Sequence, residues 1–309
     1  MNFNLLKSFV VLADRLHFGE AAAALNLSQS ALTKQIQRLE DEFGGHLFER
    51  GRQGTELTAL GRFLRQDAEG LLERAEQVRH QCRRAAQGEI GRLDVGFSFS
   101  TIDIISTLVG DFRRRHPDVE IALHDLSSSA QMDLLGQGRL NLGFVRLPAR
   151  TGLAHMRVTS DRLALAVPAV RAAQIPRFDV PLLRDRPFIG LMRERAPGLH
   201  DHIARFCQSR GFTPRLAQYA NESLIMLSMV AADIGLAIMP FSTLRRPLEG
   251  VVVREIEDPG AAWDVGLAWT TGTSDPLTHK FIELTSLAGT HPHQKPALTV
   301  TEAANPAPI

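Results

Sequence analysis

The chain has 309 residues, 35 Lys or Arg against 34 Asp or Glu, and a formal net charge of +1. This length allows two or three domains that each bury a core, whereas the near-neutral charge excludes a strongly basic nucleic-acid binder. Cys82 and Cys207 are the only cysteines, and no apolar run approaches the ~18–20 residues of a membrane span, so we expect a reducing cytoplasm and no membrane contact.

Near the N-terminus, a short helix of small residues precedes an amphipathic helix. Residues 19–25 contain four alanines, so another helix can approach them closely. Asn26 tolerates the left-handed backbone of a tight turn, and Ser28 is a good N-cap for a helix over residues 28–40. Two short helices joined by such a turn are typical of a helix-turn-helix. This stretch alone leaves open an ordinary helical hairpin with a solvated face.

The helix over residues 28–40 has two unlike faces. Leu32, Ile36 and Leu39 recur at helical spacing and predict a buried face. The opposite face carries side chains that donate and accept hydrogen bonds: Gln29, Ser30, Thr33, Lys34 and Gln37. Such a polar face is the kind that a recognition helix presents to the major groove of DNA.

Two glycines among basic and β-prone residues predict a hairpin over residues 49–58, which would form a wing beside the helices. The motifs at residues 28–36, 39–40, 47–50 and 57–61 together resemble the winged helix-turn-helix of LysR-type transcriptional regulators. The residues that this resemblance and the polar face assign to DNA contacts are Ser28, Gln29, Ser30, Thr33, Lys34, Arg50 and Arg52. Gln29 suits base reading, because an amide can pair with adenine through two hydrogen bonds; Lys34, Arg50 and Arg52 suit the phosphate backbone.

Two positions depart from the family pattern. Many members have a basic or neutral residue where this chain has Glu20, and the wing usually carries its arginine where this chain has Gln53. The resemblance therefore does not extend to DNA contacts from these two positions. It implies a bacterial regulator that binds double-stranded promoter DNA as a homodimer or homotetramer, with RNA polymerase as a further candidate partner.

Thr58 can cap a long helix that ends near Ala86. Small and apolar residues recur in it at alternating spacings of four and three, as in a coiled-coil seam: Leu64, Ala68, Leu71, Ala75, Val78, Cys82 and Ala85. The alternative is a single amphipathic helix that packs on its own domain. We favour dimerisation, because alanines suit close helix approach and a helix-turn-helix needs a two-fold partner to read a palindrome.

After a hinge at residues 87–91, strands and helices alternate. The predicted strands lie at residues 92–97, 119–126 and 140–145, and the predicted helices at residues 102–115 and 129–137. Two such crossovers imply a parallel sheet covered by helices. Residues 188–239 repeat the pattern, and strands near residues 162–167 and 263–269 are expected to cross between the halves. This arrangement resembles the periplasmic-binding-protein fold that LysR-type regulators use to bind effectors.

The predicted fold class is therefore α/β with three parts and a tail. The parts are a winged helix-turn-helix at residues 1–57, a linker and dimerisation helix at residues 58–88, and a bilobed effector-binding domain at residues 91–290. Subdomain I would comprise residues 91–163 and 268–290, and subdomain II residues 164–267. The proline-containing tail at residues 291–309 is expected to be disordered, and its two histidines to be solvated rather than bound to metal.

Ligands of open parallel sheets bind beyond the carboxyl ends of the strands. Hydroxyl residues follow the first two predicted strands, and Arg146 follows the third. In similar regulators, the serine/threonine cluster after the second strand and the arginine after the third line the effector cleft. We expect effector contacts from Ser98, Ser100, Thr101, Ser128 and Arg146, opposite residues 191–193 and 219–222. Hydroxyls and an arginine suit a small anion; helix capping is the alternative role for each serine.

The motifs do not predict an enzyme. His124 and Asp125 are adjacent on a predicted strand and so point to opposite faces, and the chain has no G-x-S-x-G, HExxH or P-loop motif. No cofactor is expected. We expect a sequence-specific DNA-binding transcriptional regulator that a small, anionic metabolite modulates. The alternative is a constitutive or architectural DNA-binding protein without an effector.

Overall fold

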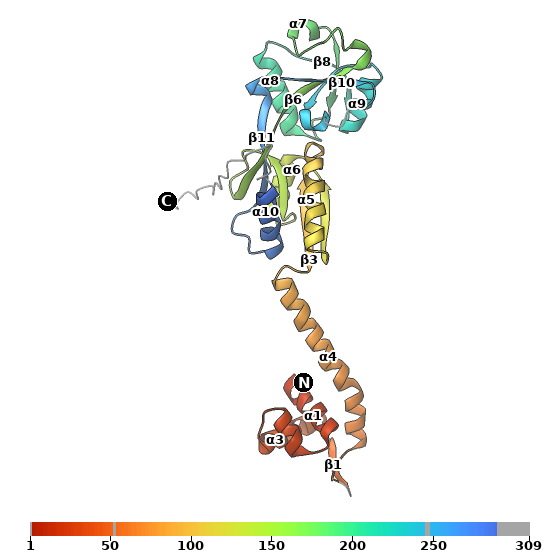
Figure 1. The fold of residues 1–309 in the computed structure, drawn as a ribbon, viewed down its shortest axis with the longest axis vertical. Coiled ribbons are helices and arrows are strands. Elements are labelled where there is room, and N and C mark those ends of the chain that lie inside the picture. Colours follow the sequence, from red (N-terminus) through yellow and green to blue (C-terminus); the bar gives the residue numbers. More distant parts are fainter. Residues whose placement is uncertain (1, 52–53, 245–247, 289–309) are drawn as a thin grey trace, which may run out of the picture. The chain divides into compact units, whose positions relative to one another are not determined.

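The computed structural model of the protein describes residues 2–51, 54–244 and 248–288. Packing divides the chain into two compact units, one up to Ala86 and the other from Gln87 (Figure 1). Arg52, Gln53 and the predicted tail at residues 291–309 lie outside the described residues. None of the described helices combines the length and hydrophobicity that crossing a membrane requires.

The first unit contains the predicted helix-turn-helix. Helices α1 (Phe3–Arg15), α2 (Phe18–Ala24) and α3 (Gln29–Phe43) bury one core, which includes Phe9, Leu32 and Leu39. The turn between α2 and α3 places Asn26 at φ +53°, and Ser28 Oγ accepts a hydrogen bond from Ala31 N at 3.2 Å. Both local predictions are confirmed.

The predicted wing is also present, as strands β1 (Phe48–Gly51) and β2 (Gly54–Leu57) paired antiparallel. Glu40 on α3 holds its start, because its Oε1 accepts from Leu47 N at 2.8 Å. At the other end of the hairpin, Thr58 Oγ1 accepts from Gly61 N at 3.0 Å and so caps the next helix. A Cβ on Gly61 would lie 2.2 Å from Leu47 O, so only glycine fits this position.

Helix α4 (Ala59–Ala86) matches the predicted linker helix in extent. The first part of its seam packs on its own unit: Ala68 is fully buried, and Leu64 packs against the same core. This part follows the alternative that the sequence left open. Leu71 and Val78 are 41% and 45% exposed, and Cys82 is exposed as well, so an apolar stripe is uncovered only beyond Ala68.

The second unit consists of two lobes that share crossing strands. Lobe I contains the parallel strands β3 (Gly91–Phe97), β4 (Val119–Asp125) and β5 (Leu142–Arg146), the short η1 (Phe99–Thr101), and helices α5 (Ile102–Arg115), α6 (Ser128–Gly136) and α10 (Pro276–Ala288). Its main core packs α5 and α10 against the sheet, with Phe112 and Phe281 in contact at 5.3 Å between ring centroids.

Lobe II repeats the βα pattern. It contains η2 (Ala169–Arg171), α7 (Val180–Leu183), β7 (Pro187–Leu191), α8 (Pro197–Ser209), β8 (Arg215–Ala220), α9 (Ser223–Ala231), β9 (Ala237–Pro240), η3 (Phe241–Leu244), β10 (Val251–Glu255) and η4 (Pro259–Ala261). Two cores cover its sheet, one including Phe188 and Phe206 and one including Met226 and Met239. Strand β10 and helix α7 were not predicted. The sequence favoured Asn221 as the N-cap of α9, because asparagine is a good capping residue. In the structure Glu222 occupies this position, and its side chain makes no capping bond there.

The crossing strands are β6 (Leu153–Pro168) and β11 (Ala262–Thr270), which pair antiparallel. They produce a seven-stranded mixed sheet in the order β10-β6-β11-β5-β3-β4, with β9 also on β6. The predicted parallel pairing of β3, β4 and β5 is confirmed. The antiparallel pairing of the crossing strands was not predicted, and β6 begins earlier than residue 162. Residues Val265–Ala268 of β11 already pair with β5 of lobe I, which places the change of lobe before residue 268.

Candidate functional site

The polar face of α3 presents exposed side chains at the start of the helix. Gln29, Ser30 and Lys34 are exposed, and Leu32 and Ile36 on the opposite face are buried. This is the arrangement that the spacing predicted. Amide, hydroxyl and ammonium groups of such a face can reach base edges and phosphates of a DNA groove.

Two of the predicted DNA-contacting hydroxyls also hold the helix. Ser28 Oγ caps α3 and lies 3.1 Å from Ser30 Oγ. Thr33 Oγ1 donates to Gln29 O at 2.9 Å, which is the common back-bond of a threonine within a helix. Ser28 and Thr33 therefore fix the backbone that presents Gln29 and Lys34.

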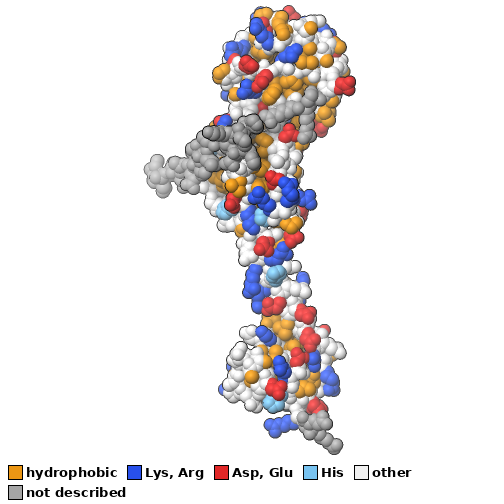
Figure 2. Space-filling view, in the orientation of Figure 1, with side chains coloured by type: hydrophobic (Ala, Val, Ile, Leu, Met, Phe, Trp, Pro, Cys, Tyr) orange, Lys and Arg blue, Asp and Glu red, His pale blue; other side chains and the backbone are white. Residues whose placement is uncertain are grey.

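On the wing, Arg50 is exposed and lies opposite Thr55, and the next pair along the hairpin is Glu49 opposite Glu56. Glu20, the other departure from the family pattern, is exposed in the first turn of α2. A carboxylate at that position interacts favourably with the helix N-terminus. Figure 2 shows Lys and Arg side chains interspersed with Asp and Glu over the visible face of each unit, in keeping with the near-neutral charge.

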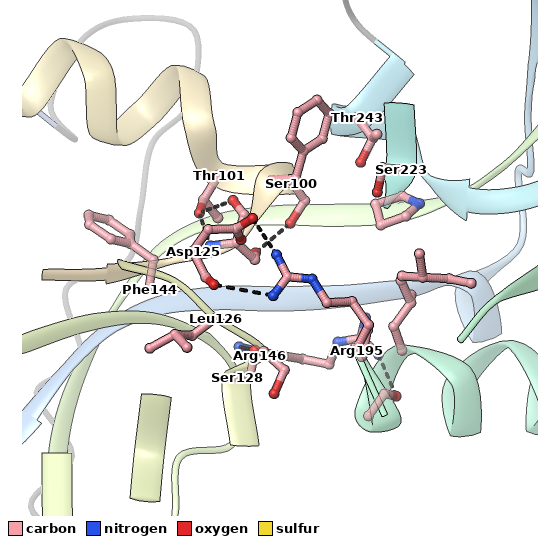
Figure 3. A pocket seen from close by; sticks show the side chains of 18 of the residues that line it. Ser100, Thr101, Asp125, Leu126, Ser128, Phe144, Arg146, Arg195, Ser223 and Thr243 are labelled. Carbon is pink, nitrogen blue, oxygen red and sulfur yellow. Dashed lines mark hydrogen bonds and ion pairs between the residues drawn. The ribbon is translucent and has the colours of Figure 1, made fainter. Parts of the chain in front are cut away.

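The second unit contains a cleft of about 320 Å³ between its lobes (Figure 3). All five residues predicted to contact an effector line it: Ser98, Ser100, Thr101, Ser128 and Arg146. Residues of lobe II face them, among them Asn221, Glu222 and Ser223 at the start of α9. The carboxyl ends of β3, β4 and β5 thus meet at one cleft, because parallel strands end at the same edge of a sheet.

The hydroxyls after β3 differ in their roles. Thr101 is 2% exposed, and its Oγ1 both donates to Ser98 O at 2.9 Å and accepts from Ser98 N at 3.2 Å. Ser98 Oγ and Ser100 Oγ lie 3.0 Å apart. Thr101 therefore closes the turn that leads into α5, and the two serines present hydroxyls to the cleft.

After β4, Ser127 caps α6 by accepting from Ala130 N at 3.3 Å. Ser128 Oγ instead accepts from Arg146 N at 3.0 Å. This bond joins the start of α6 to the end of β5 and fixes the backbone from which the Arg146 side chain extends. Capping thus explains Ser127, whereas Ser128 positions the arginine.

The Arg146 guanidinium reaches from lobe I toward lobe II. Its Nη1 donates to Gly198 O at 3.3 Å, and its Cζ lies 4.1 Å from the centroid of the Trp263 ring, a cation–π geometry. Burial lowers the pKa of Arg146 to about 10, while Asp161 raises it and Arg205 lowers it. The group therefore carries its full charge at neutral pH.

A second arginine, which the sequence analysis missed, crosses the cleft. Arg195 Nη2 lies 2.6 Å from Asp125 Oδ2, and its Nη1 lies 3.4 Å from Asp125 O. Figure 3 shows Arg195 of lobe II reaching Asp125 at the end of β4. Arg195 lies in the connection from β7 to α8, two residues past the facing segment 191–193. It reaches the cleft through tertiary packing, for which the sequence holds no local signal.

His124 and Asp125, which are adjacent on β4, have different side-chain partners. His124 Nε2 lies 2.8 Å from Asp94 Oδ1, whereas the side chain of Asp125 pairs with Arg195. The pKa of the Asp94 carboxyl is lowered to about 2, chiefly by its hydrogen bond with Arg92 and also by His124, against the raising effect of burial. The described residues also hold no group of three or more His, Cys, Asp or Glu side chains that could bind a metal ion.

Comparison with known proteins agrees with this architecture. Residues 3–62 match the bacterial regulatory helix-turn-helix protein, lysR family, and residues 86–287 match the LysR substrate binding domain. The HTH-type transcriptional regulator AlsR of Bacillus subtilis is 30% identical over 97% of this chain and 100% of its own length. ClcR of Pseudomonas putida is 32% identical over 78% of this chain and 83% of its own length.

Solved structures share the fold over almost the whole chain. Full-length CbnR in complex with its target DNA has a TM-score of 0.74 at 24% identity and covers 94% of this chain and 100% of that one. The crystal structure of CbnR, a LysR family transcriptional regulator, has a TM-score of 0.69 at 25% identity and covers 92% and 100%.

The chain belongs to the LysR family of bacterial transcriptional regulators. It is a DNA-binding regulator with a substrate-binding domain, and not an enzyme. The predicted family and the predicted fold class are therefore confirmed.

Proposed function

We propose that the chain controls transcription by reading a specific DNA site through α3 and the wing, and that a small anion bound between the lobes changes this activity. The observation that supports an anionic ligand is the position of Arg146. Its charged guanidinium lines the cleft, held by Gly198 O and the Trp263 ring, and Ser128 fixes the backbone from which it extends. Arginine binds carboxylates and phosphates more strongly than a neutral donor does, because the hydrogen bonds are charge-assisted.

The ion pair between Asp125 and Arg195 offers a route from ligand to response. Asp125 belongs to lobe I and Arg195 to lobe II, so this pair links the lobes in the state described here. An anion that reaches Arg195 competes with the carboxylate of Asp125. A ligand shifts a conformational equilibrium only by preferring one state, and a coupling of ~1–3 kcal/mol is the usual scale.

For DNA, we propose that Gln29 and Ser30 read bases, that Lys34, Arg50 and Arg52 contact phosphates, and that Ser28 and Thr33 add contacts while holding α3. Gln29→Ala should then relax specificity at one base position, with a loss of ~1–3 kcal/mol in discrimination. Lys34→Ala should weaken binding to all DNA sequences. It should also reduce the slope of log affinity against log salt concentration by about one. Gln37→Ala, two turns further along α3, is the matched control. Equal losses on specific and unrelated DNA would remove Gln29 from base reading.

For assembly, we propose a homodimer through the uncovered part of α4 and, as the family resemblance implies, a tetramer through the effector domains. Leu71→Asp places a charge in the exposed stripe and should dissociate the dimer. Glu73→Ala on the same helix serves as the control. Sedimentation that shows the same oligomer for Leu71→Asp and wild type would rule out this part of α4 as the interface.

The decisive experiment is footprinting on the DNA upstream of the chain's own gene, with and without a panel of small metabolites. We expect at least one anion to change the footprint of the wild type. Arg146→Ala should abolish this change and keep operator binding, because Arg146 lies in the other packing unit from α3. Arg139→Ala, an exposed arginine outside the cleft, should respond normally. A footprint that no ligand changes would indicate a constitutive DNA binder.

A further inference from the structure

Lobe II contains a second cavity, of about 220 Å³, beneath helix α8. We call it the annex. Its walls are mainly apolar and come from β7, α8 and the segment that follows α8: Ile189, Leu199, Ile203, Ala204, Cys207 and Phe212. The annex belongs to one lobe only, whereas the cleft lies between the two lobes.

The annex adjoins the cleft directly. Leu191, Ala196 and Leu199 line both cavities, so these three apolar residues form a wall that the cavities share. Leu191 ends β7, and Ala196 and Leu199 flank the start of α8. All three are partly exposed, and the only residues between Ala196 and Leu199 are Pro197 and Gly198.

Arg146 lies beside this shared wall. Its Nη1 donates to the carbonyl of Gly198 at 3.3 Å, and the next residue, Leu199, lines both cavities. A carboxylate bound by Arg146 would therefore lie next to the wall that the cleft and the annex share. Gly198 adds no side chain there, and a Cβ built on it would meet nothing within 4 Å.

The lining of the annex is suited to apolar groups. Cys207 is 1% exposed, and burial raises the pKa of its thiol to about 12. The neutral thiol therefore behaves as a small apolar group at physiological pH. Apolar surface that enters such a cavity leaves water, and this transfer is favourable in proportion to its area.

We infer that the ligand of the cleft is amphiphilic: an anionic head group binds at Arg146, and an apolar chain or ring passes Leu191 and Leu199 into the annex. This inference rests on the proposed function, because it places the head group in the same cleft. The annex then selects by the apolar part of the ligand, and Arg146 selects by charge. Small polar anions without an apolar part bind weakly.

A series of straight-chain monocarboxylates, from butyrate to decanoate, tests the inference by calorimetry on the full-length protein. In the wild type, the affinity should rise about three- to fourfold for each added methylene, and should level off when the chain exceeds the annex. Ala204→Leu fills the annex and should abolish this dependence, so that octanoate binds no more tightly than butyrate does. Ala173→Leu, an exposed position outside both cavities, is the size-matched control.

Ile203→Ala enlarges the annex and should shift the plateau to longer chains, which keeps the test informative should Ala204→Leu fail to fold. Arg146→Ala should weaken every acid by the same factor. A chain-length dependence that Ala204→Leu leaves unchanged, or none in the wild type, overturns the annex even where binding still needs Arg146. If the affinity depends on the length of the acid but Arg146→Ala does not change it, the annex is supported and the proposed head-group site is overturned. Absence of octanoate binding overturns the inference.

Discussion

The polar face of α3 and the polar wall of the cleft use similar residues, but they hold them differently. On α3, Gln29, Ser30 and Lys34 are exposed to solvent, and a DNA groove would bring its own donors and acceptors to them. In the cleft, Thr101 and Asp125 are bonded to other parts of the same unit. A cleft must satisfy its polar groups until a ligand arrives, because an unpaired buried group is costly.

Because of this difference, a substitution on α3 should affect mainly binding, whereas a substitution in the cleft should affect both binding and stability. Under the proposed function, replacing an exposed side chain at the start of α3 should remove a contact with DNA and little else. Replacing a cleft residue removes a contact with the ligand and also a bond within the fold. The two surfaces can therefore be compared by measuring stability and binding together for the same variant.

The largest effect is expected from the scaffold beneath α3, at Gly61. Gly61→Ala should destabilise the first unit by about 3 kcal/mol, because the added Cβ would overlap the backbone oxygen of Leu47. The matched control is Gly70→Ala in the same helix, where a Cβ meets nothing within 4 Å; that change should stabilise by ~0.5–1 kcal/mol. The stabilities of the two variants are compared by urea unfolding, with hydrogen exchange of residues 2–86 as the signal. Equal stabilities for both variants would contradict the prediction.

Gly61 also shows which features of the first unit can be predicted from the sequence. Its place in the motif after Leu57 and Thr58 indicated the family, and the Ser28 cap, the Asn26 turn and the wing were predictable, because each depends on neighbours a few residues away. The close approach of Gly61 to Leu47 was not predictable, since it depends on how a hairpin folds back on the start of α4.

In the second unit, only the cleft residues at the ends of the predicted strands could be predicted from the sequence. Hydroxyls and an arginine at the carboxyl ends of β3, β4 and β5 could be assigned to a cleft, because the βα pattern orders these strands. Arg195 and Trp263 could not, because they reach the cleft from lobe II through tertiary packing. The length of β6 was underestimated for the same reason: its first part becomes a strand by pairing with β11, which is about a hundred residues away.

The next largest effect distinguishes structural from ligand-facing hydroxyls within the cleft. Thr101→Val should destabilise the second unit by ~1–2 kcal/mol, because the backbone of Ser98 loses its partner and the valine keeps the shape. Ser100→Ala should change stability by less than ~0.5 kcal/mol and weaken ligand binding. Thermal unfolding and calorimetry on both variants, with Thr101→Ser as the conservative control, provide the measurement. Weaker ligand binding by Thr101→Val at unchanged stability would reverse the two roles.

A smaller effect is expected at the ion pair across the cleft. Asp125→Asn should raise the affinity for an anionic ligand by up to about fivefold. In the wild type, Arg195 must break its ion pair with Asp125 before it can bind the ligand. The side chains of the pair are 41% and 43% exposed, so the pair contributes at most ~1 kcal/mol. Asp201→Asn, which removes the partner of Arg193 outside the cleft, should leave the affinity unchanged. Equal affinities for wild type and Asp125→Asn would separate Arg195 from ligand binding.

The smallest effect returns to the DNA-facing unit, where the wing carries a like-charge pair. Glu49 lies directly opposite Glu56 on the hairpin, and like charges opposite each other destabilise a strand pair by a few tenths of a kcal/mol. Glu56→Gln removes the repulsion and should increase the hydrogen-exchange protection of β1 and β2 slightly. Glu56→Lys should increase it further by creating an opposite-charge pair, and should also strengthen binding to unrelated DNA in a salt-dependent way. The background Glu49→Gln tests the cause: there, the additional protection from Glu56→Gln should disappear, because no repulsion remains to be relieved. The same gain in both backgrounds would attribute it to the glutamine itself and not to the pair.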